Sequence, residues 1–143
     1  MTGEKAVATL LREMKPTLRD GEFVFCSVPG TLREVLHLAP EGCFWEAEGL
    51  SLILRREAAE TEGLVFGGIY RLITLGVHSS LNAVGFLAKI SGALAAKGIS
   101  FNPVAAYYHD HLFVPADRAR DAMNVLRKLA ETAGEAVDSE GGS

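Results

Sequence analysis

The chain begins with an amphipathic pattern of helical period. Four apolar residues recur at the spacing i, i+3, i+4, i+7: Val7, Leu10, Leu11 and Met14. This spacing places them on one face of a helix, where they can cover a core. Pro16 cannot continue the helix, so the pattern predicts a helix that begins near Glu4 and ends near Met14.

Runs of β-prone residues separated by turn residues fill the rest of the first half. The run FVFCSV lies between an Asp-Gly pair and a Pro-Gly pair, which predicts a strand with a turn at each end. Two further apolar runs flank the sequence EAEG and predict a β-hairpin. The expected elements are a strand over 23–28, a short helix from Thr31 to Leu36, hairpin strands over 43–45 and 50–54, and a helix over 56–62.

The second half shows a similar alternation of strand and helix patterns. Gly98 follows a helical stripe and favours a left-handed helix stop, and Pro115 suits the first position of a last helix. The expected elements are a strand over 69–77, a helix over 83–97, strands over 99–108 and 112–114 that meet at the sequence YHDH, and a helix after Pro115.

The two halves repeat one arrangement of strand, glycine-containing turn, helix, hairpin and helix. This repetition predicts an α+β fold of two ferredoxin-like βαββαβ modules with antiparallel sheets and helices on one face. We place the modules at residues 4–64 and 65–131 and expect a disordered, glycine-rich tail over 132–143. Because uncovered sheet edges invite pairing, we expect the halves, or two chains, to lend each other an edge strand.

Composition places the chain among globular proteins and excludes several partners. Of its 143 residues, 48% are hydrophobic and 22% are charged, and the formal net charge is -4 at pH 7. The 14 lysines and arginines are scattered singly or in pairs, so no basic stripe can neutralise a nucleic acid. No apolar run approaches the ~20 residues of a membrane span, and the N-terminus lacks a secretory-signal pattern. We therefore expect a cytoplasmic protein without nucleic-acid or membrane partners.

The two cysteines, Cys26 and Cys43, form neither a C-x-x-C motif nor a zinc-finger spacing. This usage is typical of reduced, partly buried thiols in a reducing compartment. A redox role is the weaker alternative.

The junction between the strand over 69–77 and the helix after it is the first candidate binding site. The first N–H groups of a helix have no partner within the helix and carry the positive end of its dipole, so they favour an anion. Ser79, Ser80 and Asn82 can cap this helix or donate to a ligand, and Gly85 leaves room near the backbone. The competing interpretation is structural, with Ser80 or Asn82 only an N-cap and Gly85 a packing contact.

Asp110 lies where two predicted strands of the same half join, at the end that this fold can bring near the junction. A carboxylate beside an anion site suits a zwitterion such as an α-amino acid, whose ammonium group Asp110 would bind. Each charge-assisted contact contributes roughly 1.5 to 3 kcal/mol. The alternative is that Asp110 is only a turn residue.

Several segments of the chain resemble a family of small bacterial tandem ACT-domain proteins. In the second half they are ITLGVHSSLNAVG from Ile73, GISFN from Gly98 and YYHDHLFV from Tyr107. FVFC from Phe23 and EAEGLSLIL from Glu46 fit the first half of that family. The resemblance covers about residues 4–130.

The resemblance implies two ACT-type modules, a ferredoxin-like fold that binds amino acids and other small effectors, often at interfaces between modules or subunits. The second half is similar to the ACT modules of aspartate kinases and of cytosolic arginine sensors, which carry an effector loop ending in glycine. By that likeness, Asp110 is the partner of an effector's ammonium group. The implied effector loop comprises Ser79, Ser80, Ala83, Val84 and Gly85.

One departure concerns the Pro-Gly pair that often starts the helix after this loop in the family. The chain has Val84-Gly85 at this position, while Pro29-Gly30 lies in the first half. Either half, or the interface between them, can therefore hold the ligand. The family also lacks an attached enzyme, so a regulatory output would lie in another protein.

A metal site is the first alternative function. His109 and His111 alternate on a predicted strand and could join His78 as ligands, although His-x-His pairs are common by chance. A hydrolase would need Ser79 or Ser80 as nucleophile and His78 as base, but the sequence has no G-x-S-x-G, P-loop or G-x-G-x-x-G motif. We therefore expect neither an enzyme nor a cofactor.

The second alternative is a ligand-free structural module. In that interpretation an exposed edge strand and the pair Tyr107-Tyr108 serve dimerisation. With or without a ligand we expect a homodimer, since a second chain can pair with a free sheet edge. The favoured hypothesis is a non-enzymatic regulatory protein that binds a small-molecule effector, an amino acid.

Overall fold

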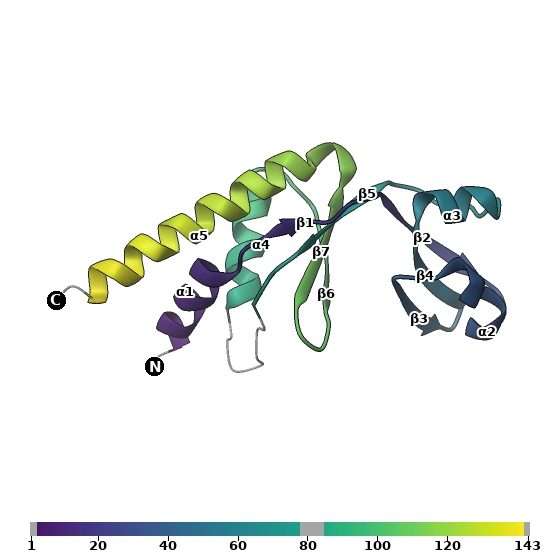
Figure 1. Cartoon of the computed structure of the whole chain (residues 1–143), viewed down its shortest axis with the longest axis horizontal. Coiled ribbons are helices and arrows are strands. Elements are labelled where there is room, and N and C mark those ends of the chain that lie inside the picture. The colour runs from purple at the N-terminus through teal and green to yellow at the C-terminus, as the bar shows by residue number, and fades with distance from the viewer. Residues whose placement is uncertain (1–2, 78–84, 142–143) are drawn as a thin grey trace. The chain divides into compact units, whose positions relative to one another are not determined.

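The computed structural model describes residues 3–77 and 85–141. The chain divides into two compact units (Figure 1). The terminal unit contains residues Met1–Arg19 and Leu72–Ser143, and the inserted unit comprises Asp20–Arg71. The first helix thus lies in one unit with the second half of the chain, whereas its position in the sequence predicts it in the first module.

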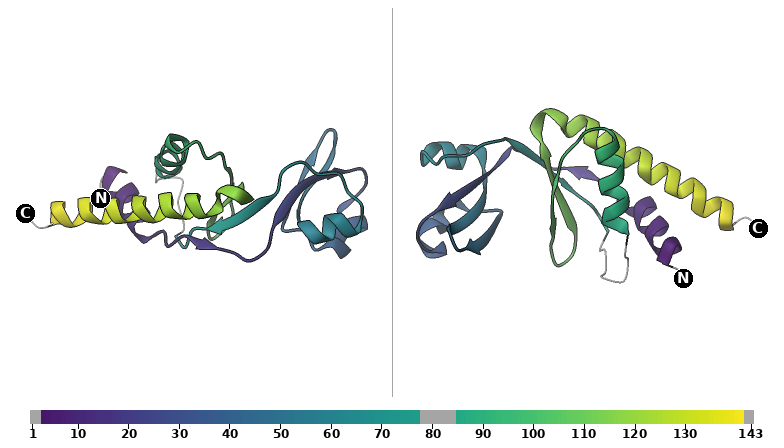
Figure 2. Two further views of the ribbon diagram at one scale, coloured as in Figure 1. Left: turned by 90° about the horizontal axis from the view of Figure 1, so that it is seen from above. Right: turned by 180° about the vertical axis from the view of Figure 1, so that it is seen from behind.

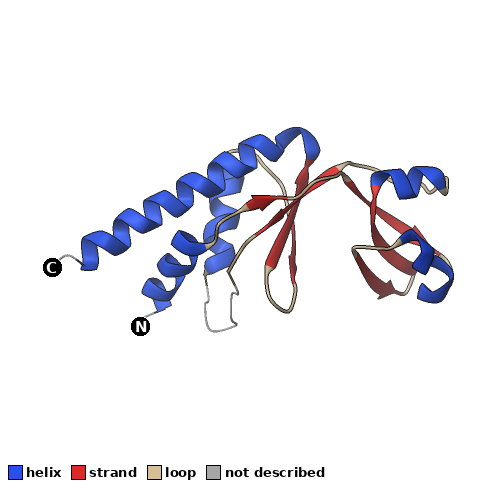
Figure 3. Ribbon diagram, viewed as in Figure 1, coloured by secondary structure: helices blue, strands red, loops and turns tan. Residues whose placement is uncertain are grey.

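The terminal unit combines long helices with antiparallel strand pairs (Figure 3). Its elements are α1 (Gly3–Glu13), β1 (Thr17–Leu18), β5 (Tyr70–Thr74), α4 (Phe86–Ala96), β6 (Asn102–Ala105), β7 (Asp110–Pro115), the 3-10 helix η2 (Ala116–Arg118) and α5 (Ala119–Gly141). The first two residues of β5 belong to the inserted unit. β1 pairs antiparallel with the end of β5, β7 is the neighbour of β5, and β6 pairs antiparallel with β7.

One apolar core holds the terminal unit together. Side chains from α1, α4 and α5 pack against β5 and β7, and the most deeply buried of them are Met14, Ile73, Leu75, Ile90, Leu94, Leu112, Val114, Ala122 and Leu126. α1 runs beside α5 (Figure 2), where Ala133 is buried and Arg12 lies against Gly134. The small residues on α5 leave space for this close approach of the two helices.

The inserted unit is built on a three-stranded sheet with short helices. Its elements are β2 (Phe23–Val28), α2 (Leu32–Val35), the 3-10 helix η1 (Leu36–Leu38), β3 (Gly42–Glu46), β4 (Gly49–Arg55) and α3 (Arg56–Thr61). The strand order is β3-β4-β2, and both strand pairs are antiparallel. In the register Ile53 of β4 lies between Phe25 of β2 and Gly42 of β3.

A second, smaller core covers one face of this sheet. It is formed by Val24, Cys26, Val28, Leu50, Leu52, Leu54 and Ala59. Cys26 and Cys43 lie on either side of Leu52 in the register, so their Cα atoms are two strand spacings, about 10 Å, apart. A disulfide needs a Cα separation below about 7 Å, so the sheet keeps the two free thiols apart.

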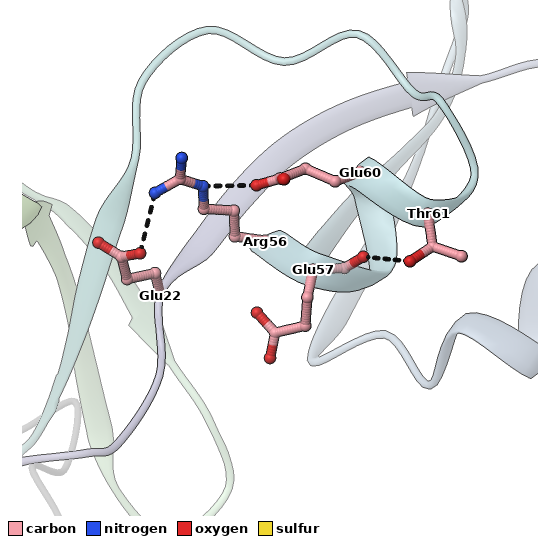
Figure 4. A network of polar contacts seen from close by, with 5 residues as sticks. All are labelled: Glu22, Arg56, Glu57, Glu60 and Thr61. Carbon is pink, nitrogen blue, oxygen red and sulfur yellow. Dashed lines mark hydrogen bonds and ion pairs between the residues drawn. The ribbon is translucent and has the colours of Figure 1, made fainter.

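Arg56, the first residue of α3, fixes this helix to the start of β2 (Figure 4). Its guanidinium donates to the Glu60 carboxylate at 2.6 Å and to the Glu22 carboxylate at 3.0 Å. Two hydrogen bonds raise the pKa of Arg56, the one to Glu60 more than the one to Glu22. The guanidinium therefore stays charged. Thr61 Oγ1 donates to the Glu57 carbonyl at 2.9 Å and closes the last turn of the helix.

The predicted α+β class with antiparallel sheets is confirmed, and β2 spans the predicted residues 23–28. The segment over 132–143, expected to be disordered, differs: α5 continues through it to Gly141. Ala133 continues the apolar stripe of Leu126 and Ala130 beneath α1, so the start of this segment is held by packing.

Among the described helices, none is both long and apolar enough to cross a membrane.

Candidate functional site

The end of β5 and the start of β7 are joined by hydrogen bonds in the terminal unit. The Leu75 N–H donates to the Asp110 carbonyl at 2.9 Å, and Thr74 Oγ1 lies 2.9 Å from His111 Nδ1 in a hydrogen bond. The Gly76 N–H donates to the Met14 carbonyl. These contacts place Asp110 beside the start of the segment that links β5 to α4.

Asp110 is the first residue of β7 and is buried, with 3% of its surface exposed. Among the described residues it is the one polar or charged residue in the buried class. The interpretation of Asp110 as a turn residue is therefore wrong, because it pairs with Ala105 within the β6–β7 ladder. Burying a carboxylate is costly unless partners compensate it, so the buried position of Asp110 calls for polar partners.

Gly85 is the N-cap residue of α4, and its φ of 101° lies in the left-handed region. Its carbonyl accepts the first hydrogen bond of the helix, from the Lys89 N–H at 2.9 Å. A Cβ atom at this position would lie 3.8 Å from Val7 Cγ2, which is an ordinary contact. The backbone conformation thus accounts for this glycine, and close packing, the structural alternative considered above, does not.

The other predicted ligand-binding residues lie outside the described residues. They are Ser79, Ser80, Asn82, Ala83 and Val84. Of the candidate site, the structure therefore describes its two ends: Leu75 with Asp110 on the strand side, and Gly85 on the helix side.

The histidines of the metal hypothesis are described in part. His109 is exposed, and its ring centroid lies 6.4 Å from that of His111 at an interplanar angle of 90°. Over residues 3–77 and 85–141, no group of three or more His, Cys, Asp or Glu side chains could hold a metal ion. His78, the third proposed ligand and the base of the hydrolase hypothesis, lies outside these ranges.

The turn between β6 and β7 lies at Tyr107 and Tyr108, two residues before the centre of the predicted turn. The Ala106 N–H donates to the His109 carbonyl at 3.0 Å and closes a two-residue turn. Tyr107 is 81% exposed and Tyr108 is 69% exposed, with their rings edge to face and centroids 4.8 Å apart. Both rings therefore lie on the surface at the end of the hairpin that carries Asp110.

Sequence reasoning missed Thr74 as a residue of this region. Its hydroxyl fixes the His111 ring and so ties β5 to β7 next to Asp110. No sequence signal marks this pair, because the contact depends on which residues face each other in neighbouring strands.

Comparison with known families finds two consecutive matches. Models of the ACT domain match residues 2–71 and residues 69–128. The predicted tandem of ferredoxin-like ACT modules is therefore confirmed. Among curated proteins no match is found.

Comparison with solved structures finds similar folds over most of the chain. A Vibrio cholerae protein of unknown function, described as a possible transport protein, is 44% identical, with a TM-score of 0.83 over 90% of this chain and 99% of that one. An Agrobacterium tumefaciens protein is 14% identical, with a TM-score of 0.67 over 82% and 90%. The regulatory subunit of Thermus thermophilus aspartate kinase is 14% identical, with a TM-score of 0.58 over 82% and 97%. At 14% identity the last two show the fold alone.

Proposed function

Since the chain belongs to the ACT-domain family, we propose that it is a non-catalytic regulatory protein that binds an amino acid as its effector. ACT domains are typically regulatory and ligand-binding, and the fold is shared with aspartate kinase regulatory domains. The observation that carries the proposal is the buried Asp110 carboxylate beside the junction of β5 and α4.

The two ends of this junction suit the two charges of an amino acid. Asp110 supplies a negative charge within the terminal unit, where an ammonium group can form a charge-assisted hydrogen bond. α4 is 11 residues long, and its first N–H groups follow Gly85, whose missing side chain cannot cap them. A ligand carboxylate at this helix end would be stabilised by the N–H groups and by the helix dipole.

The corresponding junction of the inserted unit is less suitable for an anion. There α2 has only four residues, and Glu34 in its first turn places a carboxylate at the helix start. The Glu34 Oε1 atom accepts a hydrogen bond from Thr31 Oγ1 at 3.2 Å, and a Cβ atom on Gly30 would lie 2.8 Å from Glu34 Oε2. The Pro29-Gly30 pair is thus next to a negative charge. We therefore assign the effector to the terminal unit rather than to the inserted one.

Amino-acid binding is tested by a thermal-shift screen of the full chain with the twenty amino acids. A ligand at 100 times its dissociation constant adds about 2.7 kcal/mol to the free energy of unfolding, which raises Tm by several degrees. Asp110→Asn keeps the shape of the side chain but removes its charge, so we expect the affinity for that amino acid to fall about 10- to 100-fold.

Asp117→Asn is the matched control, because Asp117 is an exposed aspartate of the same unit. The Asp117→Asn variant should bind the same amino acid with the affinity of the wild type. If no amino acid raises Tm, or if Asp110→Asn binds as tightly as the wild type while remaining folded by circular dichroism, the proposed function is wrong. Metal analysis of the purified protein tests the His78, His109 and His111 alternative in the same preparation.

ACT domains commonly dimerise, and we keep the homodimer as a prediction for this chain.

A further inference from the structure

The sheet of the inserted unit has two faces of different character. In the register, side chains alternate between the faces, and one face holds Val24, Cys26, Val28, Leu50, Leu52 and Leu54. These residues form the core of the unit, against which side chains of α2, η1 and the segment after α3 pack. This face is therefore covered by the unit's own helices and loops, apart from Trp45 of β3, which is 65% exposed.

The opposite face, which we call the outer face, is formed by the alternate residues of the same strands. They are Phe23, Phe25, Ser27, Gly42, Phe44, Glu46, Gly49, Ser51, Ile53 and Arg55. Phe23 is 0% exposed, and the Phe25 ring packs edge to face against Tyr70 with the centroids 5.2 Å apart, so the β2 side of this face is covered in part. Phe44 is 69% exposed, while Phe25 and Ile53 are partly exposed. Away from the buried Phe23, the centre of the outer face is thus an apolar surface of three large side chains, of which Phe44 is the most exposed.

Opposite charges lie at opposite ends of the outer face. Arg55 is the last residue of β4, exposed, with its guanidinium carbon 5.3 Å from the centroid of the Phe23 ring. Glu46 is the last residue of β3, exposed, and its carboxylate accepts a hydrogen bond from the Ser51 hydroxyl. Because β3 and β4 are antiparallel, these two residues mark the two ends of the strand direction.

We propose that the outer face binds the same face of a second copy of this chain. The two-fold axis would lie between the two facing sheets. It would run perpendicular to the strands and pass over Leu52. Rotation about this axis reverses the strand direction and brings Glu46 of the partner subunit to the end where Arg55 lies. Phe25, Phe44 and Ile53 then meet their counterparts at the centre, which is the self-complementarity that a two-fold interface requires.

The size of the outer face sets the strength of this association. Three strands extend about 14 Å across, and the longest is about 20 Å long, which is small for a stable interface. We therefore expect a weak dimer that forms in the micromolar range without a ligand. The outer face lies in the inserted unit and the proposed effector site in the terminal unit, so each proposal can fail without the other.

Sedimentation velocity of the full chain over a range of concentrations tests the interface. Phe44→Ser removes the exposed ring at the centre, so we expect the dimer dissociation constant to rise by about tenfold or more. Trp45→Ser is the matched control: Trp45 is the next residue of β3, is 65% exposed, and lies on the other face of the sheet. It should leave the dimer unchanged.

Charge reversal tests the orientation of the two copies. Glu46→Arg alone and Arg55→Glu alone each place like charges at both ends of the interface and should weaken the homodimer. A mixture of these two variants should restore it, because in the mixed dimer each Arg faces a Glu of the other copy.

Three results would overturn the proposal. The first is a wild-type chain that stays monomeric up to a few hundred micromolar. The second is a Trp45→Ser variant that weakens the dimer as much as Phe44→Ser, which would indicate pairing along the edge of β3. The third is a mixture of the two charge variants, each folded by circular dichroism, that associates no better than either one alone.

Discussion

The two compact units of this chain cover their strands with very different helices. The terminal unit uses helices of 11, 11 and 23 residues, whereas those of the inserted unit have 4 and 6 residues. Long helices supply the larger core, and within the same unit Asp110 is buried. The inserted unit has a small core on one face and the exposed Phe44 on the other. The proposed effector site and the proposed dimer face follow this difference.

The first prediction asks whether the two cores unfold separately. Leu126→Ala in the terminal unit and Leu52→Ala in the inserted unit each remove a side chain with 2% or less exposure, and each should cost about 3 kcal/mol. Hydrogen exchange should show faster opening of α1 and α5 in the first variant and of β2 and β4 in the second. Equal loss of protection in both units from either variant would show that they unfold as one.

The second prediction concerns the start of α4 and is smaller. Gly85→Ala forces a left-handed backbone on a residue with a side chain, and should lower stability by about 1 to 2 kcal/mol, or Tm by roughly 3 to 6 °C. Gly92→Ala is the control, because Gly92 lies inside the same helix with open space at its Cβ position. It should raise stability by about 0.5 to 1 kcal/mol. If thermal melts showed that Tm changes in the same direction in both variants, this account of Gly85 would be wrong.

The third prediction is the smallest and concerns pH. Burial raises the pKa of the Cys26 thiol above its ordinary value, so the folded chain favours the neutral thiol. As the pH rises, the Cys26 thiol ionises first in the unfolded chain. The contribution of the buried thiol to the free energy of unfolding is therefore complete below about pH 9 and is lost as the pH increases through the pKa of the folded state. Urea midpoints measured from about pH 8 to about pH 10 should fall less in Cys26→Val than in the wild type. An equal fall in both would contradict it.

Most strands and helices could be predicted from the sequence because their patterns are local. β2 lies between Asp-Gly and Pro-Gly turns, and β3 and β4 are joined by a two-residue turn. Neighbouring residues therefore suffice to predict these three strands. β1 could not be predicted, because a strand of two residues, Thr17 and Leu18, shows no alternating pattern. It pairs with β5, which is distant in the sequence.

The place of Asp110 near a strand-to-helix junction could be predicted from the sequence, but its burial could not. Asp110 was recognised as a charge near a strand-to-helix junction, yet its burial depends on the register of β6 with β7, which starts the strand at Asp110 itself. The helical end of the chain was missed for a related reason. The alanines that extend α5 are weak signals of burial until α1 packs on them.

The position of α1 bears on how the protein is made. Leu11 leaves the ribosome early, whereas Leu126, a member of the same core, is translated more than a hundred residues later. Until Leu126 is synthesised, the apolar side chains of α1 lack part of the core against which they pack. Residues 20–71, which form the inserted unit, have already been synthesised by then. Folding during synthesis would thus begin with residues 20–71 and finish when the segments before and after them join in one core.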